Sequence, residues 1–266
     1  SRKYIAAIDS DGNVTAFNPD AGNVVYALAV SGSTIYAGGD FSRIGGQYRK
    51  CIAALNAATG AATSWNPKAN GAVCAIALSG TTLYAGGEFD SIGGEERNCI
   101  AALDNATGVV VPWNPNADGP VYALGSSGDA STLYAGGRFE SIGGQVRHYI
   151  AALDAATGEA TPWDPHAGNA VYALAVRESI IYAGGEFMDI GGQVRHYIAA
   201  LDAATGEATP WDPGANGFVW TIAISGSIIY AGGWFTSIGG QPRSHVAALD
   251  GATGAATAWD PDADGY

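Results

Sequence analysis

A repeat of about 48 residues is the feature of this sequence that most restricts its fold. The tetrapeptide Tyr-Ala-Gly-Gly recurs at spacings of 48, 50, 48 and 48 residues, beginning at Tyr36, Tyr84, Tyr134, Tyr182 and Tyr230. The segment from Gly143 to Pro165 also recurs without a change from Gly191 to Pro213. Such a period is typical of chains built from stacked copies of one supersecondary unit.

Each repeat contains four runs that are typical of β-strands. In the fourth complete repeat they are Val171–Val176, Ile180–Phe187, Tyr197–Ala203 and Glu207–Trp211. Short segments rich in Gly, Asn, Asp and Pro separate the runs and favour turns. The runs are mostly continuously apolar, which predicts strands buried on both faces. Four such strands per repeat predict the blade of an all-β fold, the β-propeller.

The repeats predict a single β-propeller domain over residues 1–266. Residues 4–19 supply only a third and a fourth strand, and complete repeats follow at about 23–67, 71–115, 119–165, 169–213 and 217–261. Two strands from the half unit and four from each of five repeats make 22, between the 20 of five blades and the 24 of six. Either the half unit is extra or the missing strands come from elsewhere, because an unclosed blade exposes strand edges. Another copy of the chain could supply them, or the sequence could be a piece of a longer propeller.

Two residue types recur at fixed positions and are interpreted as scaffolding. A Trp in the fourth strand is expected to fill the wide outer space between neighbouring blades. An Arg before the third strand and an Asp or Asn at its end are expected to bond each other or backbone groups, although a ring of Arg could also bind an anion. The Trp set is Trp65, Trp113, Trp163, Trp211 and Trp259, with Phe17 in the half unit. The Arg set is Arg49, Arg97, Arg147, Arg195 and Arg243, with Arg2 in the half unit.

The three cysteines fit the same repeat. Cys51 and Cys99 stand where other repeats have Tyr149 and Tyr197, and Cys74 stands where another has Tyr172. Their number is odd and no CxxC spacing is present, which argues against a disulfide framework or a thiolate metal site. We interpret them as replacements for packed aromatic residues.

Composition excludes some classes of partner. The formal net charge is -13, from 25 acidic and 12 basic residues, so phosphate backbones and anionic lipid headgroups would be repelled. No apolar run approaches the roughly 20 residues of a membrane span, and the N-terminus lacks the long apolar region of a signal peptide. We therefore expect no nucleic acid partner and no membrane insertion. The sequence could be that of a mature product or of an excised segment.

Four short stretches of the first complete repeat carry a family resemblance. VYALAV, IYAGGDFSRIGG, IAALNAATG and SWNP resemble the delta-sixty type repeats of large bacterial surface and secreted proteins. This resemblance covers nearly the whole chain and implies a β-propeller with a binding-like role at an extracellular or cell-surface location. The run ALDAATGEATPW is also similar to the tryptophan-docking motif of quinoprotein propellers, but four residues, rather than three, precede Trp163. The second similarity implies shared blade packing and no quinone cofactor.

No motif for catalysis, metal binding or cofactor binding is found. Double glycines such as Gly184–Gly185 match neither a dinucleotide fingerprint nor a P-loop, because no Lys-Ser or Lys-Thr follows them. His148 and His196 occupy equivalent places one repeat apart, so they form no obvious ligand cluster. The oxygen-rich turns at Asn114–Gly119 and Asp260–Gly265 are interpreted as Asx turns rather than calcium loops. We predict no metal, no cofactor and no catalytic residue.

Positions that vary while the repeat stays fixed are the candidates for a binding surface. One variable set lies in the connection from the fourth to the first strand and consists of Asp20, Lys68, Asn116, His166, Gly214 and Asp262. A second set directly follows the double glycine and consists of Asp40, Glu88, Arg138, Glu186 and Trp234. Trp234 is the aromatic exception in a charged set, and it could stack on a glycan or a peptide.

We expect a non-catalytic, extracellular binding or self-assembly scaffold. Its expected partners are other copies of the chain, through the half repeat, or a glycan or peptide. The main alternative is an enzyme, either a propeller oxidoreductase or a carbohydrate-active enzyme, with carboxylates near the central channel. Under that alternative, replacing Asp40, Glu88 and Glu186 by Ala should abolish turnover.

Overall fold

The chain folds into repeated small β-sheets. The computed structural model describes residues 2–264, which form strands and no helix. The prediction of an all-β repeat protein is therefore confirmed. Residues 1, 265 and 266 of the predicted domain lie outside the described residues. Residue 265 is also the last residue of the second predicted oxygen-rich turn. Within the described range, no helix is long and apolar enough to cross a membrane.

The chain divides into two compact units, of which the first ends at Val121 and the second begins at Tyr122. The first contains the half repeat and two complete repeats, and the second contains the remaining three. The boundary falls at the start of the third repeat's first strand. Each unit is described by itself below.

The first unit contains two three-stranded antiparallel sheets. They consist of β1 (Val25–Ser31), β2 (Thr34–Gly39) and β5 (Ile52–Asn56), then β6 (Val73–Ser79), β7 (Thr82–Gly87) and β10 (Ile100–Asp104). Each sheet carries a short hairpin between its second and third strands. These hairpins are β3 (Arg43–Ile44) with β4 (Gln47–Tyr48), and β8 (Ser91–Ile92) with β9 (Glu95–Glu96).

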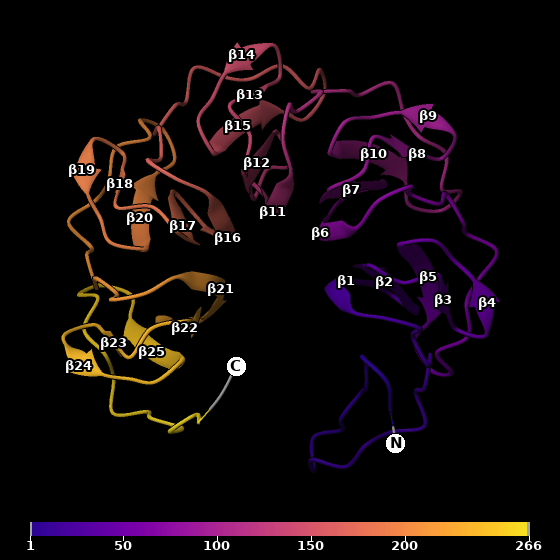
Figure 1. Ribbon diagram of the computed structural model, residues 1–266, viewed down its shortest axis with the longest axis horizontal. Coiled ribbons are helices and arrows are strands. Elements are labelled where there is room, and N and C mark those ends of the chain that lie inside the picture. The colour runs from indigo at the N-terminus through magenta and orange to yellow at the C-terminus, as the bar shows by residue number, and fades with distance from the viewer. Residues whose placement is uncertain (1, 265–266) are drawn as a thin grey trace. The chain divides into compact units, whose positions relative to one another are not determined.

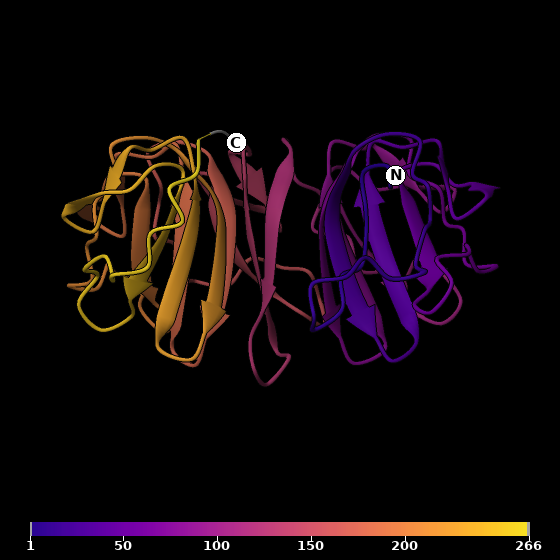
Figure 2. The same cartoon turned by 90° about the horizontal axis from the view of Figure 1, so that it is seen from below.

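The second unit repeats the same arrangement three times (Figure 1). Its sheets are β11 (Val121–Ser126), β12 (Thr132–Gly137) and β15 (Ile150–Asp154); β16 (Val171–Arg177), β17 (Ile180–Gly185) and β20 (Ile198–Asp202); and β21 (Val219–Ser225), β22 (Ile228–Gly233) and β25 (Val246–Asp250). Its hairpins are β13 (Ser141–Ile142) with β14 (Gln145–Val146), β18 (Asp189–Ile190) with β19 (Gln193–Val194), and β23 (Ser237–Ile238) with β24 (Gln241–Pro242). Figure 2 shows the long strands of each sheet side by side.

The predicted fourth strand is an extended segment that pairs only briefly with the third. In the fourth repeat it makes one bridge, Leu201 to Ala208, and the Thr209 N–H donates to the Ala200 carbonyl at 2.8 Å. The chain then bends, because the Thr209 hydroxyl accepts a hydrogen bond from the backbone N–H of Trp211 at 3.3 Å. That turn carries the Trp side chain towards the next sheet. The small hairpins between second and third strands were not predicted.

The double glycine is explained by close packing, since Gly184 faces the next sheet and Gly185 lies against the residue that precedes the first strand of its own sheet. A Cβ on Gly184 would lie 2.7 Å from Cγ1 of the buried Val219 in the next sheet, and a Cβ on Gly185 would lie 2.2 Å from the Ala170 carbonyl oxygen. Between the same two sheets, a buried cluster joins Tyr182 and Trp211 to Ile229. Only a residue without a side chain fits at the first two positions, so the glycines belong to the frame.

The half repeat is less regular than the sequence predicts. Residues 4–19 contain one β-bridge, Ile8 to Val14, and no named strand. The physical reason is that a third strand normally pairs with a second strand, as β5 pairs with β2, and residues 4–19 include no such partner. The segment is held instead by Phe17, which is buried in a cluster with Ala53 and Leu55 of the first sheet (indigo segment, Figure 1).

Candidate functional site

The first variable set occupies a strained turn position. Its six members have φ angles of 46° to 56°, the left-handed region that favours Gly, Asn and Asp. Two of the side chains contact the residue 18 places earlier in the chain. The Asn98 amide donates to the Asn116 Oδ1 at 2.7 Å, and the rings of His148 and His166 are 4.5 Å apart. Variation at this position is therefore limited by turn geometry, and the structure brings these residues into turns rather than into one cluster.

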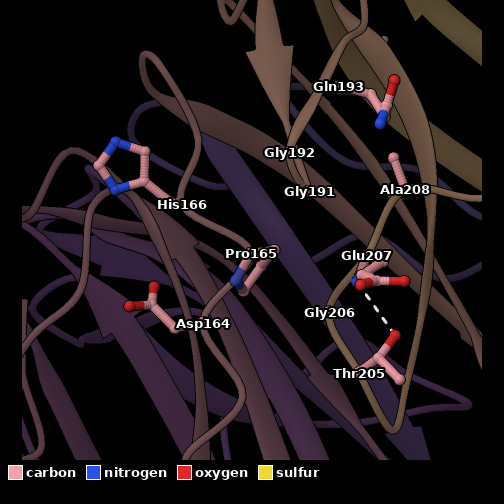
Figure 3. Close-up of a pocket in the computed structure, with 10 residues that line it drawn as sticks. All are labelled: Asp164, Pro165, His166, Gly191, Gly192, Gln193, Thr205, Gly206, Glu207 and Ala208. Carbon is pink, nitrogen blue, oxygen red and sulfur yellow. Dashed lines mark hydrogen bonds between the residues drawn. The ribbon is translucent and has the colours of Figure 1, made fainter.

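His166 borders a shallow groove of about 490 Å³ in the second unit (Figure 3). The turn at Asp164–His166, the hairpin turn at Gly191–Gln193 and the turn at Thr205–Ala208 form its walls. Asp164 is engaged beside it, since its carboxylate lies 3.6 Å from the Arg147 guanidinium. A similar groove of about 310 Å³ occurs at the equivalent place in the first unit. Because the groove recurs with the repeat, it is a feature of the frame.

The second variable set lies beside a β-bulge, which sequence reasoning missed. The register of the first strand shifts between Val171 and Ala173, and again between Val219 and Thr221. A bulge bends the strand and re-aims the residue within it. In the last two repeats that residue is Tyr172 and then Trp220, and each contacts the variable residue that follows the double glycine. The recurring aromatic in the run VYALAV was the sequence signal for this position.

In the third and fourth repeats this rim carries a polar network. The Arg138 guanidinium lies 3.2 Å from the Tyr172 hydroxyl and 3.1 Å from a Glu186 carboxylate oxygen. The Tyr172 hydroxyl donates to the same carboxylate oxygen at 2.9 Å, and its ring lies 5.6 Å from that of Tyr122. Burial raises the pKa of Tyr172 first, and the hydrogen bond to Glu186 raises it further. Glu186 is therefore held as a paired carboxylate by two donors.

At the fifth repeat the same rim carries what we term the aromatic cluster, which consists of Tyr197 from the fourth repeat and of Phe218, Trp220 and Trp234 from the fifth. The rings of Trp220 and Trp234 are 5.0 Å apart and tilted by 43°. Phe218 stacks on Trp234 at 6.4 Å with an interplanar angle of 22°, and Tyr197 contacts Phe218 at 5.7 Å. Of the predicted site residues only Trp234 belongs to this cluster, so the structure adds the other three rings.

The equivalent positions of the first unit carry Tyr26 with Asp40 and Cys74 with Glu88. Burial and then the Asp40 carboxylate raise the pKa of Tyr26. Burial, followed by the charge of Glu88, raises the pKa of Cys74 to about 12 and that of Cys99 to about 11. Both thiols stay protonated near neutral pH and are poor nucleophiles. All three cysteines are free thiols.

Three of the recurring Trp residues lie between successive sheets of the same unit, namely Trp65, Trp163 and Trp211. Trp163 and Trp211 donate from Nε1 to the carbonyl oxygens of Asp202 and Asp250, 39 positions later, both at 3.0 Å. Four of the five predicted members are 4–6% exposed, namely Trp65, Trp113, Trp163 and Trp211. Trp259 is 45% exposed. It packs edge-on against Tyr230 of its own sheet, at 5.5 Å.

The recurring Arg residues bond backbone groups rather than the Asp at the end of the third strand. Arg147 donates to the carbonyls of Thr161 and Val146 at 2.6 and 2.7 Å. Asp154 instead accepts from the backbone N–H groups of Ala156 and Thr157 and closes an Asx turn. The same guanidinium-to-carbonyl bonds are made by Arg49, Arg97, Arg195 and Arg243. Within residues 2–264, no three His, Cys, Asp or Glu side chains gather as metal ligands.

Comparison with known proteins identifies the fold. A family model described as a domain of unknown function, DUF5122 β-propeller, matches residues 226–250. Among solved structures, the chain is similar to one from a crystal structure of the mitotic checkpoint complex, with 17% identity and a TM-score of 0.67 over 97% of this chain and 71% of that one. It is also similar to BamB from Moraxella catarrhalis, with 21% identity and a TM-score of 0.53 over 92% of this chain and 64% of that one. The chain has a β-propeller fold.

The propeller fold does not specify what the chain does. A computationally designed protein, Ika8, is similar at 17% identity and a TM-score of 0.50, over 87% of this chain and 85% of that one. No curated protein matches the sequence. A checkpoint complex, BamB and a designed protein share the fold, so function must be argued from the residues that this propeller exposes.

Proposed function

We propose that the chain is a non-catalytic scaffold that assembles with strands of its own repeat type through the half repeat and the first blade. The occupant is a β-hairpin equivalent to the first and second strands of a blade. It would pair with residues 5–9 and cover the face of β1 that carries Leu28 and Val30.

The observation that carries this proposal is the exposure of apolar side chains on β1. Leu28 is 51% exposed and Val30 is 66% exposed. Their counterparts in the next blade, Ile76 and Leu78, are partly buried against the cluster that contains Tyr36 of the first blade. Full burial of an exposed Leu or Val side chain stabilises by about 1.5–3 kcal/mol, and covering these partly exposed ones would recover a part of that, which gives an incoming hairpin a driving force.

The half repeat supplies the second requirement, which is an edge for backbone pairing. In each complete blade the third strand is hydrogen-bonded to the second, as in the pairing of β5 with β2. Ile8 of the half repeat is 66% exposed, whereas its counterpart Leu55 is fully buried. An extended segment with an open edge accepts a strand by β-augmentation, with backbone bonds giving affinity and side-chain pockets giving specificity.

The resemblance to delta-sixty type repeats supports placing this scaffold at a bacterial surface or outside the cell. That location, the assembly role and the finer family are parts of the same proposal. Surface and secreted repeat proteins present many copies of one blade type, so a hairpin of matching sequence would be locally abundant.

The test is whether a peptide with the sequence of residues 171–187 binds the chain. We expect saturable binding by fluorescence anisotropy, and a smaller particle by light scattering when the peptide competes with chain-to-chain pairing. Leu28→Asp should abolish both effects, because it buries a charge under the incoming hairpin. Val109→Asp is the matched control in the same unit, since Val109 is 63% exposed on a fourth-strand segment.

Two further results bear on the proposal. Deleting residues 2–20 should dissolve higher-order particles, and circular dichroism checks that the deleted chain still folds. A chain that is monomeric at all concentrations and fails to bind the peptide would contradict the proposal, as would particles that persist in Leu28→Asp.

A further inference from the structure

We infer that the aromatic cluster of the fifth blade binds a carbohydrate by stacking a sugar ring on Trp220 and Trp234. This site does not depend on the half repeat or on the proposed assembly. It lies wholly within the unit that begins at Tyr122.

The side chains of Trp220 and Trp234 are exposed to solvent. Trp220 is 40% exposed and Trp234 is 49% exposed, in a chain whose inter-blade Trp residues before Trp259 are 4–6% exposed. Two neighbouring indole rings therefore present apolar surface to solvent. Adjacent exposed aromatics of this kind mark a ligand or partner surface more often than isolated apolar residues do.

The fold does not require an aromatic residue at Trp234. The position after the double glycine is charged in the other four blades, whereas the bulge position carries a Tyr in three of them and Cys74 in the second. Trp220 therefore enlarges an aromatic that recurs in the frame, and Trp234 is the feature particular to the fifth blade. The pairing of the two Trp rings is not explained by the packing that all blades share.

Contacts within the fifth blade fix the two Trp side chains in place. Trp220 lies in the bulge of β21, and its ring packs against that of Trp234 at 5.0 Å. Phe218 stacks behind Trp234, and the Trp234 backbone N–H donates to the Phe218 carbonyl at 2.7 Å. Side chains that are fixed before binding lose little conformational entropy when a ligand arrives.

The repeat also indicates where polar groups lie relative to the cluster. Arg138 of the third blade reaches Tyr172 in the bulge of the fourth blade. Glu186 holds the same place in the fourth blade relative to Trp220 in the bulge of the fifth. From this equivalence we infer that the Glu186 carboxylate, which is paired with Arg138, lies on the rim next to the cluster. A ligand stacked on the two Trp rings would then have hydrogen-bonding groups to one side.

Ring geometry favours a sugar over a cationic ligand. Sites for quaternary ammonium ligands are typically cages in which several aromatic faces surround the cation. Trp220 and Trp234 instead touch each other, with centroids 5.0 Å apart, so no cation fits between them. A pyranose has one flat face of C–H groups and a rim of hydroxyls, which matches an open aromatic surface beside charged hydrogen-bonding groups.

The experiment is a screen of the full chain against soluble oligosaccharides of glucose, galactose, mannose and N-acetylglucosamine, by saturation-transfer NMR and then calorimetry. We expect at least one oligosaccharide to bind. Trp220→Ala and Trp234→Ala should each weaken its binding at least about tenfold, because a well-placed aromatic contact contributes on that scale. Trp259→Ala should change the affinity less than about twofold, since this exposed Trp lies outside the cluster.

Thermal unfolding of each variant separates loss of the site from loss of the fold. If no oligosaccharide binds, or if binding survives in both cluster variants, the inference is overturned. Selective binding of a peptide or of a quaternary ammonium compound to the cluster, with no sugar bound, would overturn the carbohydrate assignment.

Discussion

The junctions inside the two units and the open faces at the chain's first and last blades are built from the same sequence pattern, yet their side chains have opposite environments. Trp211 is 5% exposed and donates from Nε1 to the Asp250 carbonyl of the following blade. Trp259 stands at the equivalent place and is 45% exposed. Leu28 is 51% exposed, whereas its counterpart Leu174 packs against the cluster that contains Tyr134.

This contrast shows that the neighbouring blade is what buries these side chains. Local sequence determines the strand and the turn, but a blade has two apolar faces and can bury neither alone. The faces of the first and last blades that have no blade against them are therefore exposed, and the substitutions of Trp and of Gly compare them with the internal junctions.

The largest difference is expected between two Trp substitutions. Trp211→Ala should lower the free energy of unfolding by about 3–5 kcal/mol, because it leaves a cavity between two blades. Trp259→Ala should lower it by less than about 1 kcal/mol, because the side chain is already half exposed. Thermal and urea unfolding measure both, and equal losses would contradict the contrast.

A smaller effect is expected when a methyl group is added to the double glycine. A Cβ on Gly184 would meet Cγ1 of the buried Val219 at 2.7 Å, so Gly184→Ala should destabilise by about 1–3 kcal/mol through overpacking. In the last blade a Cβ on Gly232 would meet Cγ2 of Thr221, also at 2.7 Å, and otherwise only the His245 carbonyl oxygen at 3.8 Å, which is an ordinary contact distance. Thr221 is exposed and can rotate away, so Gly232→Ala should be neutral or slightly stabilising. Equal destabilisation of the two variants by urea unfolding would remove the distinction.

Acid sensitivity should come from the Asx turns of the second to fifth blades, in which the acceptor is an Asp carboxylate. Backbone hydrogen bonds from Thr205 and Ala204, with a further bond from the Thr205 hydroxyl, lower the pKa of Asp202. A lowered folded-state pKa gives stability that is present above the ordinary Asp value near 3.9 and is lost as pH falls through the folded value. Asp202→Asn keeps the acceptor oxygen, as Asn56 does in the first blade, and removes the proton linkage.

The measurement for this prediction is the melting temperature between pH 5 and pH 2. The slope should be shallower in Asp202→Asn than in the parent, and steeper in Asn56→Asp. Parallel curves for all three proteins would show that the Asx carboxylates contribute nothing to acid unfolding.

The smallest expected effect on stability is at the cysteines. Burial, followed by Glu88, raises the pKa of Cys74 to about 12 and of Cys99 to about 11, so stability is present below the ordinary thiol value and is lost as pH rises through the folded values. At pH 8 both thiols should react with iodoacetamide at least tenfold more slowly in the folded chain than in urea. Mass spectrometry gives each rate, and equal rates in both states would contradict the assigned burial.

Periodicity was enough to predict the repeat, the all-β class and the place of the glycines, because each depends on a residue type that recurs at one spacing. It could not predict the bulge that re-aims Tyr172 and Trp220, since a bulge depends on how one strand pairs with the next. Nor could it predict that Leu28 is exposed while Leu174 is packed. Their local sequences match, and the difference arises from what lies beside them.

The candidate site was predicted in part for the same reason. Trp234 was identified because it breaks a charged set, but Trp220 occupies a position where Tyr26 and Tyr172 looked like ordinary core residues. The pairing of the two Trp residues required the register of β21 with β22. The first variable set occupies turn positions with positive φ angles. Sequence variation alone therefore could not distinguish residues of a binding surface from residues of a turn.

In the proposed assembly, two strands like the first and second strands of a blade pair with the half repeat and cover the first blade. The most direct measurement is the melting temperature of a chain in which residues 171–194 are placed before Arg2, so that the half repeat becomes a complete blade. We predict a rise of several degrees and loss of binding to the peptide of residues 171–187, because the added hairpin covers Leu28 and Val30. An unchanged melting temperature with those side chains still open to solvent would contradict the account.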